Sequence, residues 1–272
     1  MSSHVKPKIA ISACLLGENV RFNGGHKQSL LCSQTLSDYF DFVPLCPEVA
    51  IGLGIPRQAI RLVGDPNQPQ AVGSVNPALN VTQPLDDYGQ QMAREHTDLC
   101  GYIFMQKSPS CGLERVKVYR DNGTPVDGGG RGIYAQAFCA RHPNLPVEED
   151  GRLNDPVLRE NFLTRVFVYA SWQQLLADGY FSELMAGLKK CATRGTHTNV
   201  LQHISGYLKQ AISADDKQEM QTVIGQYRHG IVPLVVPLTL LKHHFRQHPD
   251  RYIAQQAYLQ PHPENLSLRN AI

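Results

Sequence analysis

The chain has 272 residues, of which 42% are hydrophobic and 18% are charged, and its formal net charge is +2. This is the composition of an ordinary folded protein long enough for two domains, and it excludes an intrinsically disordered chain. The small charge gives no support for nucleic-acid binding, and no run of about 18 apolar residues predicts a membrane span. The first ten residues, MSSHVKPKIA, lack the apolar core of a signal peptide, so we expect a cytoplasmic protein.

Short apolar runs alternate with turn-rich segments through the first half of the chain. Three of the runs predict buried strands, at residues 8–12, 42–45 and 101–105. Helical spacing of apolar residues predicts helices at 29–39 and 84–99. The alternation of strands and helices is typical of a parallel sheet covered by helices.

The stretch from 64 to 84 is rich in Pro, Gly, Asn and Gln and predicts a loop with one short strand at 70–72. An edge strand is expected at 115–119, and the glycine-rich segment 127–132 precedes a helix at 133–141. That segment matches neither GxGxxG in register nor GxxxxGK[ST], so it predicts a tight turn with close backbone packing. We therefore expect an α/β domain with a mainly parallel, three-layer sheet over residues 1–155.

From residue 156 onward the pattern is helical. Apolar residues recur at helical spacing over 156–176, 196–212, 214–227 and 237–248. Ser213 is a suitable N-cap for the third of these helices, because its hydroxyl can accept from a free backbone N–H. The sequence predicts a smaller, all-α C-terminal domain over residues 156–272.

Three of the seven cysteines follow apolar runs, at points where the chain leaves a predicted strand: Cys14, Cys46 and Cys111. Ligands of open α/β sheets bind at the carboxyl ends of the strands, so we expect the three thiols to meet in one crevice. A closed iron–sulfur site takes four protein ligands, and three would leave one iron open for chemistry. The other four cysteines are expected to be small buried hydrophobic residues.

Polar residues beside these cysteines suggest chemistry. Glu48 stands two residues after the second cysteine, where a carboxylate can act as general base or acid or position a water; a surface glutamate in a turn is the alternative. Lys107, Ser108 and Ser110 precede the third cysteine and can bind a heterocycle or stabilise negative charge. Arg21, near the first cysteine, can pair with Glu48 or with a substrate carbonyl.

The motifs ISACLLGENVRFNGG, CPEVAIGLGIPR and KSPSCG, followed by the glycine stretch that enters a helix, resemble the bacterial TudS-like thiouracil desulfidases. The resemblance covers about residues 8–149. It implies a 4Fe–4S cluster whose protein ligands are Cys14, Cys46 and Cys111 and whose fourth iron is free of protein. It also implies that Glu48 and Ser108 are catalytic.

The reaction that this resemblance implies is the hydrolytic, non-redox removal of sulfur from a thiolated pyrimidine such as 2-thiouracil or 4-thiouracil, which yields uracil and sulfide. Glu48 would activate water, and Ser108 would orient or protonate the ring. We expect Arg21, Lys107 and Ser110 to bind the substrate. Two other hypotheses remain open: a sulfur-transfer enzyme, and a non-catalytic metal-binding module that interacts with thiolated RNA or a thiolated nucleotide.

The helical half resembles a second bacterial family, the YbgA-like domains. The segments that carry this resemblance are ATRGTHTNVLQH, IVPLVVPLT and YLQPHP. Between Trp172 and Lys190 the chain is shorter than the resemblance implies, which suggests a shortened helical domain.

Overall fold

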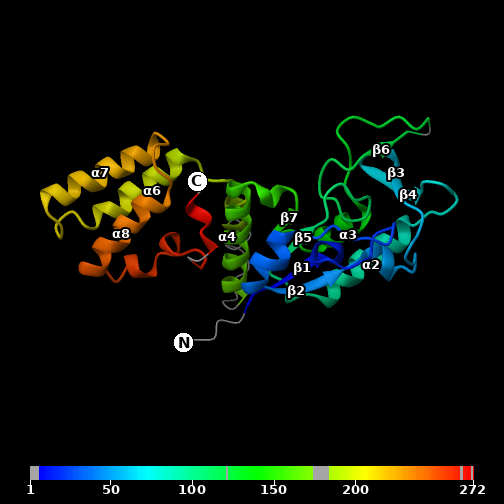
Figure 1. The fold of residues 1–272 in the computed structure, drawn as a ribbon, viewed down its shortest axis with the longest axis horizontal. Helices are drawn as coiled ribbons and strands as arrows, with labels where there is room; N and C mark the ends of the chain where they lie inside the picture. Colours follow the sequence, from blue (N-terminus) through cyan, green and yellow to red (C-terminus); the bar gives the residue numbers. More distant parts are fainter. Residues whose placement is uncertain (1–5, 121, 174–183, 264–265, 271) are drawn as a thin grey trace. The chain divides into compact units, whose positions relative to one another are not determined.

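A computed structural model describes residues 6–120, 122–173, 184–263, 266–270 and 272 (Figure 1). The chain forms two compact units. The sheet unit contains the described residues up to 154 together with 169–173, and the helical unit contains 155–168 and the described residues from 184 onward. No described helix combines the length and the apolar character that crossing a membrane requires.

A four-stranded parallel sheet, in the order β2-β1-β5-β7, forms the centre of the sheet unit. Its strands are β1 (Lys8–Ser12), β2 (Asp41–Leu45), β5 (Gly101–Phe104) and β7 (Val147–Glu149). The two central strands, β1 and β5, are almost wholly buried, as expected for parallel strands rich in apolar residues. Because all four strands run in the same direction, their carboxyl ends meet at one edge. The predicted α/β class is confirmed, although β7 was not predicted.

Two helices, α2 (Thr82–Glu95) and α3 (Ile133–Arg141), pack against each other in this unit. Gly89 allows their close approach, since a Cβ there would come within 2.8 Å of the Tyr134 carbonyl oxygen. The core beneath them is aromatic, and the Tyr102 hydroxyl donates to that of Tyr134 at 3.2 Å. The helix predicted at 29–39 is instead a π-helical turn, Leu31–Thr35, followed by a 3₁₀ turn, Leu36–Asp38.

A second, smaller sheet confirms the short strand predicted at 70–72, which lies within β4, and corrects the prediction of a loop for the residues before it. Strands β3 (Ile60–Asp65) and β4 (Gln68–Gly73) form an antiparallel hairpin, and β6 (Val118–Tyr119) pairs in parallel with β3. The hairpin turns through an Asx turn in which the Asn67 N–H donates to Asp65 Oδ1 at 2.9 Å. The exposed residues of the hairpin are Gly64, Asp65, Gln68 and Gln70, so its composition resembles that of a loop.

The helical unit confirms the predicted all-α character, because none of its described residues forms a strand. Helix α4 (Pro156–Gln173) contributes its first part to this unit, and α6 (Arg194–Gly206), α7 (Ala214–Arg228) and α8 (Val235–Gln247) follow. Ser213 caps α7 as predicted, its Oγ accepting from the Asp216 N–H at 3.1 Å. After α8 the chain continues through short 3₁₀ turns.

Two predictions from the sequence fall on residues that the structure does not describe. The predicted end of the helix at 174–176, and most of the shortened segment between Trp172 and Lys190, lie outside the described residues.

Candidate active site

A cavity of about 370 Å³ lies at the carboxyl edge of the parallel sheet. Its walls come from the ends of β1 and β2, from residues 57–60 and from the loop 105–111 that follows β5. Cys14, Cys46 and Cys111 all line it, so the parallel sheet brings together three thiols that are far apart in the chain. Glu48 and Ser108 line the same cavity.

Cys14 lies in a 3₁₀ turn, Ala13–Leu16, directly after β1. Its carbonyl oxygen accepts from the Lys27 N–H at 3.0 Å, which folds the intervening loop back over the strand end. Burial raises the pKa of the Cys14 thiol to about 11; the charge of Cys46 adds to this effect, and Arg21 opposes it. Even with Arg21 nearby, this sulfur keeps its proton near neutral pH.

Cys46 is the N-cap residue of a short helix, α1 (Pro47–Ala50), and its sulfur donates to the Val20 carbonyl oxygen at 3.7 Å. Burial raises the pKa of the Cys46 thiol, and the backbone N–H groups of Val49 and Glu48 oppose that rise. Free N–H groups at a helix start stabilise negative charge, so this position favours a thiolate more than burial alone would.

Cys111 is the most deeply buried of the three thiols. Burial raises its pKa well above the usual range, and the charges of Glu48 and Cys46 add to the effect. A hydrogen bond with the Ser12 side chain lowers the pKa of Cys111. Ser12 is buried at the end of β1 and its Oγ accepts from the Met105 N–H at 2.9 Å. The sequence analysis gave Ser12 no role, because a serine that ends a strand carries no distinctive signal.

The thiols and the carboxylate therefore form a crowded acidic group. The charge of Glu48 raises the pKa of Cys46 and Cys111, and the charge of Cys46 raises the pKa of Cys14 and Cys111. Among the residues that the structure describes, no three His, Cys, Asp or Glu side chains are grouped closely enough to hold one metal ion. The assignment of the three cysteines as cluster ligands stays a prediction, which is supported by the cavity that all three line.

Both carboxylate oxygens of Glu48 are held. Arg57 Nε donates to Oε2 at 2.9 Å, Nη2 of the same residue lies 2.9 Å from that oxygen, and the Ser110 hydroxyl donates to Oε1 at 2.8 Å. Arg57 is itself fixed by bonds from Nη1 to the Gly54 carbonyl and from Nη2 to the Val20 carbonyl, both 2.9 Å. The Arg57 side chain is 5% exposed, so this is a buried ion pair with a defined orientation.

Arg57, and not Arg21, is thus the ion-pair partner of Glu48. Sequence reasoning missed it, although Arg57 ends the motif CPEVAIGLGIPR, because a nine-residue separation through a loop has no helical or strand period. Arg21 lines the cavity, with its guanidinium 5.7 Å from the ring centroid of Phe22. Ser110 is wholly buried and its hydroxyl is engaged by Glu48, which differs from the direct substrate contact we expected.

The loop before Cys111 presents Ser108 to the cavity. Ser108 Oγ accepts from the N–H groups of Ser110 and Cys111 at 3.2 and 3.1 Å, so the remaining hydrogen-bonding capacity of the hydroxyl includes its own proton. Lys107 also lines the cavity and has a φ of +57°, a left-handed conformation that is unfavourable for residues with a Cβ. Such strain is often found at functional sites.

Glycines from the segment 127–132 hold this loop in place. A Cβ on Gly132 would lie 2.5 Å from the carbonyl carbon and oxygen of Ser110, so only glycine fits there. The Gly132 N–H donates to the Gly112 carbonyl at 2.8 Å, and the N–H groups of Ile133 and Ala135 donate to the carbonyls of Pro109 and Ser110, both at 3.1 Å. The prediction of close backbone packing is confirmed at this point.

Comparison with known proteins places this cysteine-lined α/β unit in a family. The sequence model of the 2-thiouracil desulfurase family matches residues 9–150, and the chain belongs to this family. Residues 165–263 match a second family, described as a protein of unknown function (DUF1722). Both resemblances noted in the sequence are thereby confirmed.

Two individual proteins are similar to parts of the chain. An uncharacterized protein YbgA of Escherichia coli (strain K12) is 33% identical over 104 residues, which are 37% of this chain and 60% of that protein. The chain thus spans less than two thirds of the length of this relative. A solved structure described as the [4Fe-4S]-dependent thiouracil desulfidase TudS is 28% identical, covers 55% of this chain and 94% of its own, and has a TM-score of 0.42.

Proposed function

We propose that this protein removes sulfur from a thiolated uracil by hydrolysis and releases uracil and hydrogen sulfide. Membership of the 2-thiouracil desulfurase family supports a desulfurating role. The observation that carries the proposal is that Cys14, Cys46 and Cys111 line one cavity together with Glu48 and Ser108.

The donor set of this cavity fits a 4Fe–4S cluster. Burial raises the pKa of all three thiols, and neighbouring negative charges raise it further. A bound cation is therefore needed before all three can ionise, and thiolates bind iron. When bound, the cluster would supply a Lewis-acidic iron with an affinity for the sulfur of the substrate.

Glu48 is the group suited to accept a proton from the attacking water. Arg57 and Ser110 fix the plane of its carboxylate, so the oxygens keep one orientation towards the cavity. Water adds to the ring carbon that carries sulfur, and Glu48 takes one of its two protons. When the carbon–sulfur bond breaks, the added oxygen loses its second proton and becomes the carbonyl oxygen of uracil. Both protons leave with the sulfide as hydrogen sulfide, so atoms and charges balance without an oxidant or a reductant. In this assignment Ser110 is a positioning residue.

Ser108 is suited to donate to a ring nitrogen or a carbonyl oxygen of the pyrimidine, because backbone N–H groups already occupy its acceptor side. Arg21 and Lys107 line the same cavity and can bind the remaining carbonyl. The expected partner is a small thiolated pyrimidine.

The test is anaerobic reconstitution of the full-length protein with iron and sulfide. We expect about four iron atoms per chain and release of sulfide from 2-thiouracil or 4-thiouracil. Cys111→Ser should lose both the iron and the activity. Cys32→Ser changes a buried thiol that does not line the cavity and should lose neither. Iron binding without desulfuration of either compound would refute the enzyme assignment and favour a binding module.

A further inference from the structure

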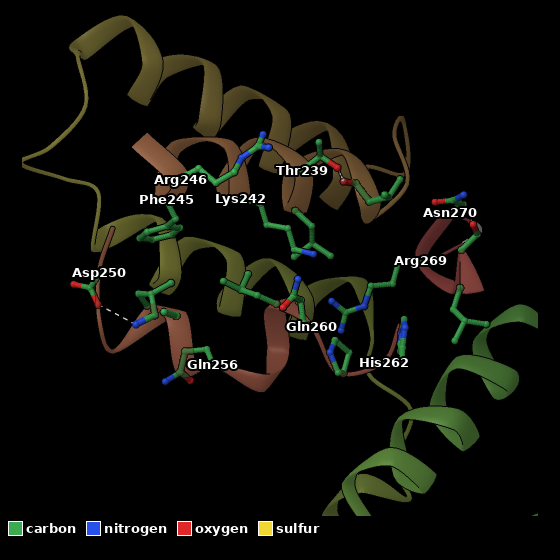
Figure 2. A pocket seen from close by; sticks show the side chains of 18 of the residues that line it. Thr239, Lys242, Phe245, Arg246, Asp250, Gln256, Gln260, His262, Arg269 and Asn270 are labelled. Carbon is green, nitrogen blue, oxygen red and sulfur yellow. Dashed lines mark hydrogen bonds between the residues drawn. The ribbon is translucent and has the colours of Figure 1, made fainter. Parts of the chain in front are cut away.

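The helical unit contains a cavity of about 700 Å³ (Figure 2). Its lining comes from α8 and from the turns that follow, between residues 235 and 270. The volume is far larger than a packing void and falls in the range of about 300–1,000 Å³ that is usual for small-molecule sites. Apolar side chains make up much of the wall, among them Leu238, Phe245, Ile253 and Leu259.

The polar side chains of this cavity are mainly cationic or donors. Figure 2 shows the ends of Lys242, Gln260, His262 and Arg269 gathered towards its middle. Asp250 is the single carboxylate among the described lining residues, and its Oδ1 accepts from the backbone N–H three residues further on at 2.9 Å. A cavity with this lining favours negative charge.

Arg269 is built firmly into the wall. Its side chain is 10% exposed, Nη1 donates to the Tyr258 carbonyl at 2.7 Å, and Nε lies 3.4 Å from Glu160 Oε1. Its guanidinium carbon also lies 5.0 Å from the centroid of the Tyr258 ring. A guanidinium held at these points loses little further freedom when it binds an oxyanion.

His262 adds a second buried donor. Its side chain is 5% exposed, and its Nε2 lies 3.6 Å from Glu160 Oε1, an ion-pair contact when the imidazole is protonated. Burial alone would raise the pKa of Glu160, but His262 and Arg269 hold it below the usual range, so the carboxylate stays charged.

We propose that this cavity binds a small organic oxyanion, either a carboxylate or a phosphate monoester, attached to an apolar body. The oxyanion lies between Arg269 and Lys242, and the apolar body packs against Leu238, Phe245 and Leu259. No residue of this site lines the cysteine cavity, and the proposal does not rest on the desulfuration.

The test uses the full-length protein with benzoate and phenyl phosphate as probes. Binding is measured by calorimetry and by changes in the NMR signals of the backbone amides of Ile253 and Leu268. We expect at least one probe to bind and to shift both signals, whereas neutral benzamide does neither. Tighter binding of benzoate assigns a carboxylate ligand, and tighter binding of phenyl phosphate assigns a phosphate ester. Inorganic phosphate that binds as tightly as phenyl phosphate would overturn the role of the apolar wall.

Lys242→Gln is the decisive variant, since Arg269 also supports the fold. Loss of one charge-assisted hydrogen bond should weaken probe binding about tenfold. Lys209→Gln changes an exposed lysine of the same unit that does not line the cavity and should leave binding unchanged. Equal affinities of these two variants, or no binding of either anion at up to about 10 mM, would overturn the proposal.

Discussion

The two cavities of this protein are assembled in opposite ways. The cysteine cavity takes its walls from segments spread between residues 12 and 111, whereas the cavity of the helical unit is lined by one stretch between 235 and 270. A parallel sheet brings distant segments together because its strands end at one edge. A helical unit without such an edge forms its cavity from one helix and the irregular turns beside it.

The two cavities also differ in charge. Thiols and a carboxylate crowd the first, where burial and mutual charge raise the pKa of each cysteine. Cationic side chains dominate the second, with one carboxylate among its described lining residues. This difference agrees with the two proposals made above, a metal centre in the sheet unit and an anion in the helical unit.

The largest effect is expected at Glu48, the proposed proton acceptor of the cysteine cavity. Glu48→Gln removes the proton acceptor but keeps the size of the side chain and a polar group near Arg57. We expect kcat to fall by about 10²–10⁴-fold while the iron content is unchanged. Glu18→Gln, at an exposed position of the same unit, is the control. A Glu48→Gln enzyme that works at full rate would remove Glu48 from the mechanism.

The next largest effect is expected at Arg57, which tests whether one segment of the cavity wall orients a catalytic side chain of another. Arg57→Gln frees the Glu48 carboxylate from its ion pair. Misplacement of a catalytic group lowers the rate, so kcat should fall by about 10²-fold with little change in KM. Arg57→Lys should recover only part of the rate, because an ammonium cannot reproduce the forked geometry. A change in KM alone would assign Arg57 to substrate binding.

These residues show what the sequence could and could not predict. The three cysteines, Glu48 and Ser108 were predictable as neighbours, because each follows a strand whose apolar run is evident. The family resemblance then supplied their expected roles. Arg57 and Ser12 were not predictable, since their contacts depend on how a loop folds back and on what lies beyond a strand end.

The fold shows the same limit. Buried strands and capped helices were predicted from apolar periodicity, and the structure confirms them at β1, β5 and α7. Of the β3–β4 hairpin only the strand at 70–72 was predicted, because the exposed residues of the hairpin are as polar as those of a loop. The cavity of the helical unit was missed because 3₁₀ turns of three residues carry no period that marks a lining side chain.

A smaller effect on the free energy of unfolding is expected in the sheet unit at alkaline pH. Burial raises the pKa of Cys32 from 9.0 to about 11, with a hydrogen bond from Ser29 opposing the rise. The folded state therefore keeps this proton where the unfolded chain loses it. The stability that the neutral thiol contributes is complete below pH 9 and is lost as the pH rises from 9 to 11. The loss should amount to about 2–3 kcal/mol.

The measurement is urea unfolding of the metal-free, reduced protein at about pH 8 and about pH 10.5. Cys32→Ala removes the titrating thiol, so its stability should fall less between these pH values than that of the unsubstituted protein. Cys191→Ala, at an exposed position, is the control. A Cys32→Ala variant with the same pH dependence as the unsubstituted protein would contradict the assignment.

The smallest effect is expected in the helical unit. His244 is 5% exposed on α8, and neither ring nitrogen has a hydrogen-bond partner among the described residues. His244→Leu removes this cost and should stabilise the unit by about 1 kcal/mol in urea unfolding. His243→Leu, at the exposed neighbouring position, should change stability by less than about 0.5 kcal/mol. Destabilisation by His244→Leu would show that the imidazole has a role that the contacts do not reveal.

The close main-chain packing around Gly132 determines which positions can be changed to alter the range of compounds that the protein accepts. The segment from Ser108 to Cys111 is held by main-chain bonds from the start of α3 and by the side-chain bonds of Ser108 and Ser110. Directed evolution can therefore exchange wall residues such as Phe22 and Met105 without disturbing the segment. Position 132 itself offers no such freedom, and libraries that retain glycine there will retain folded members.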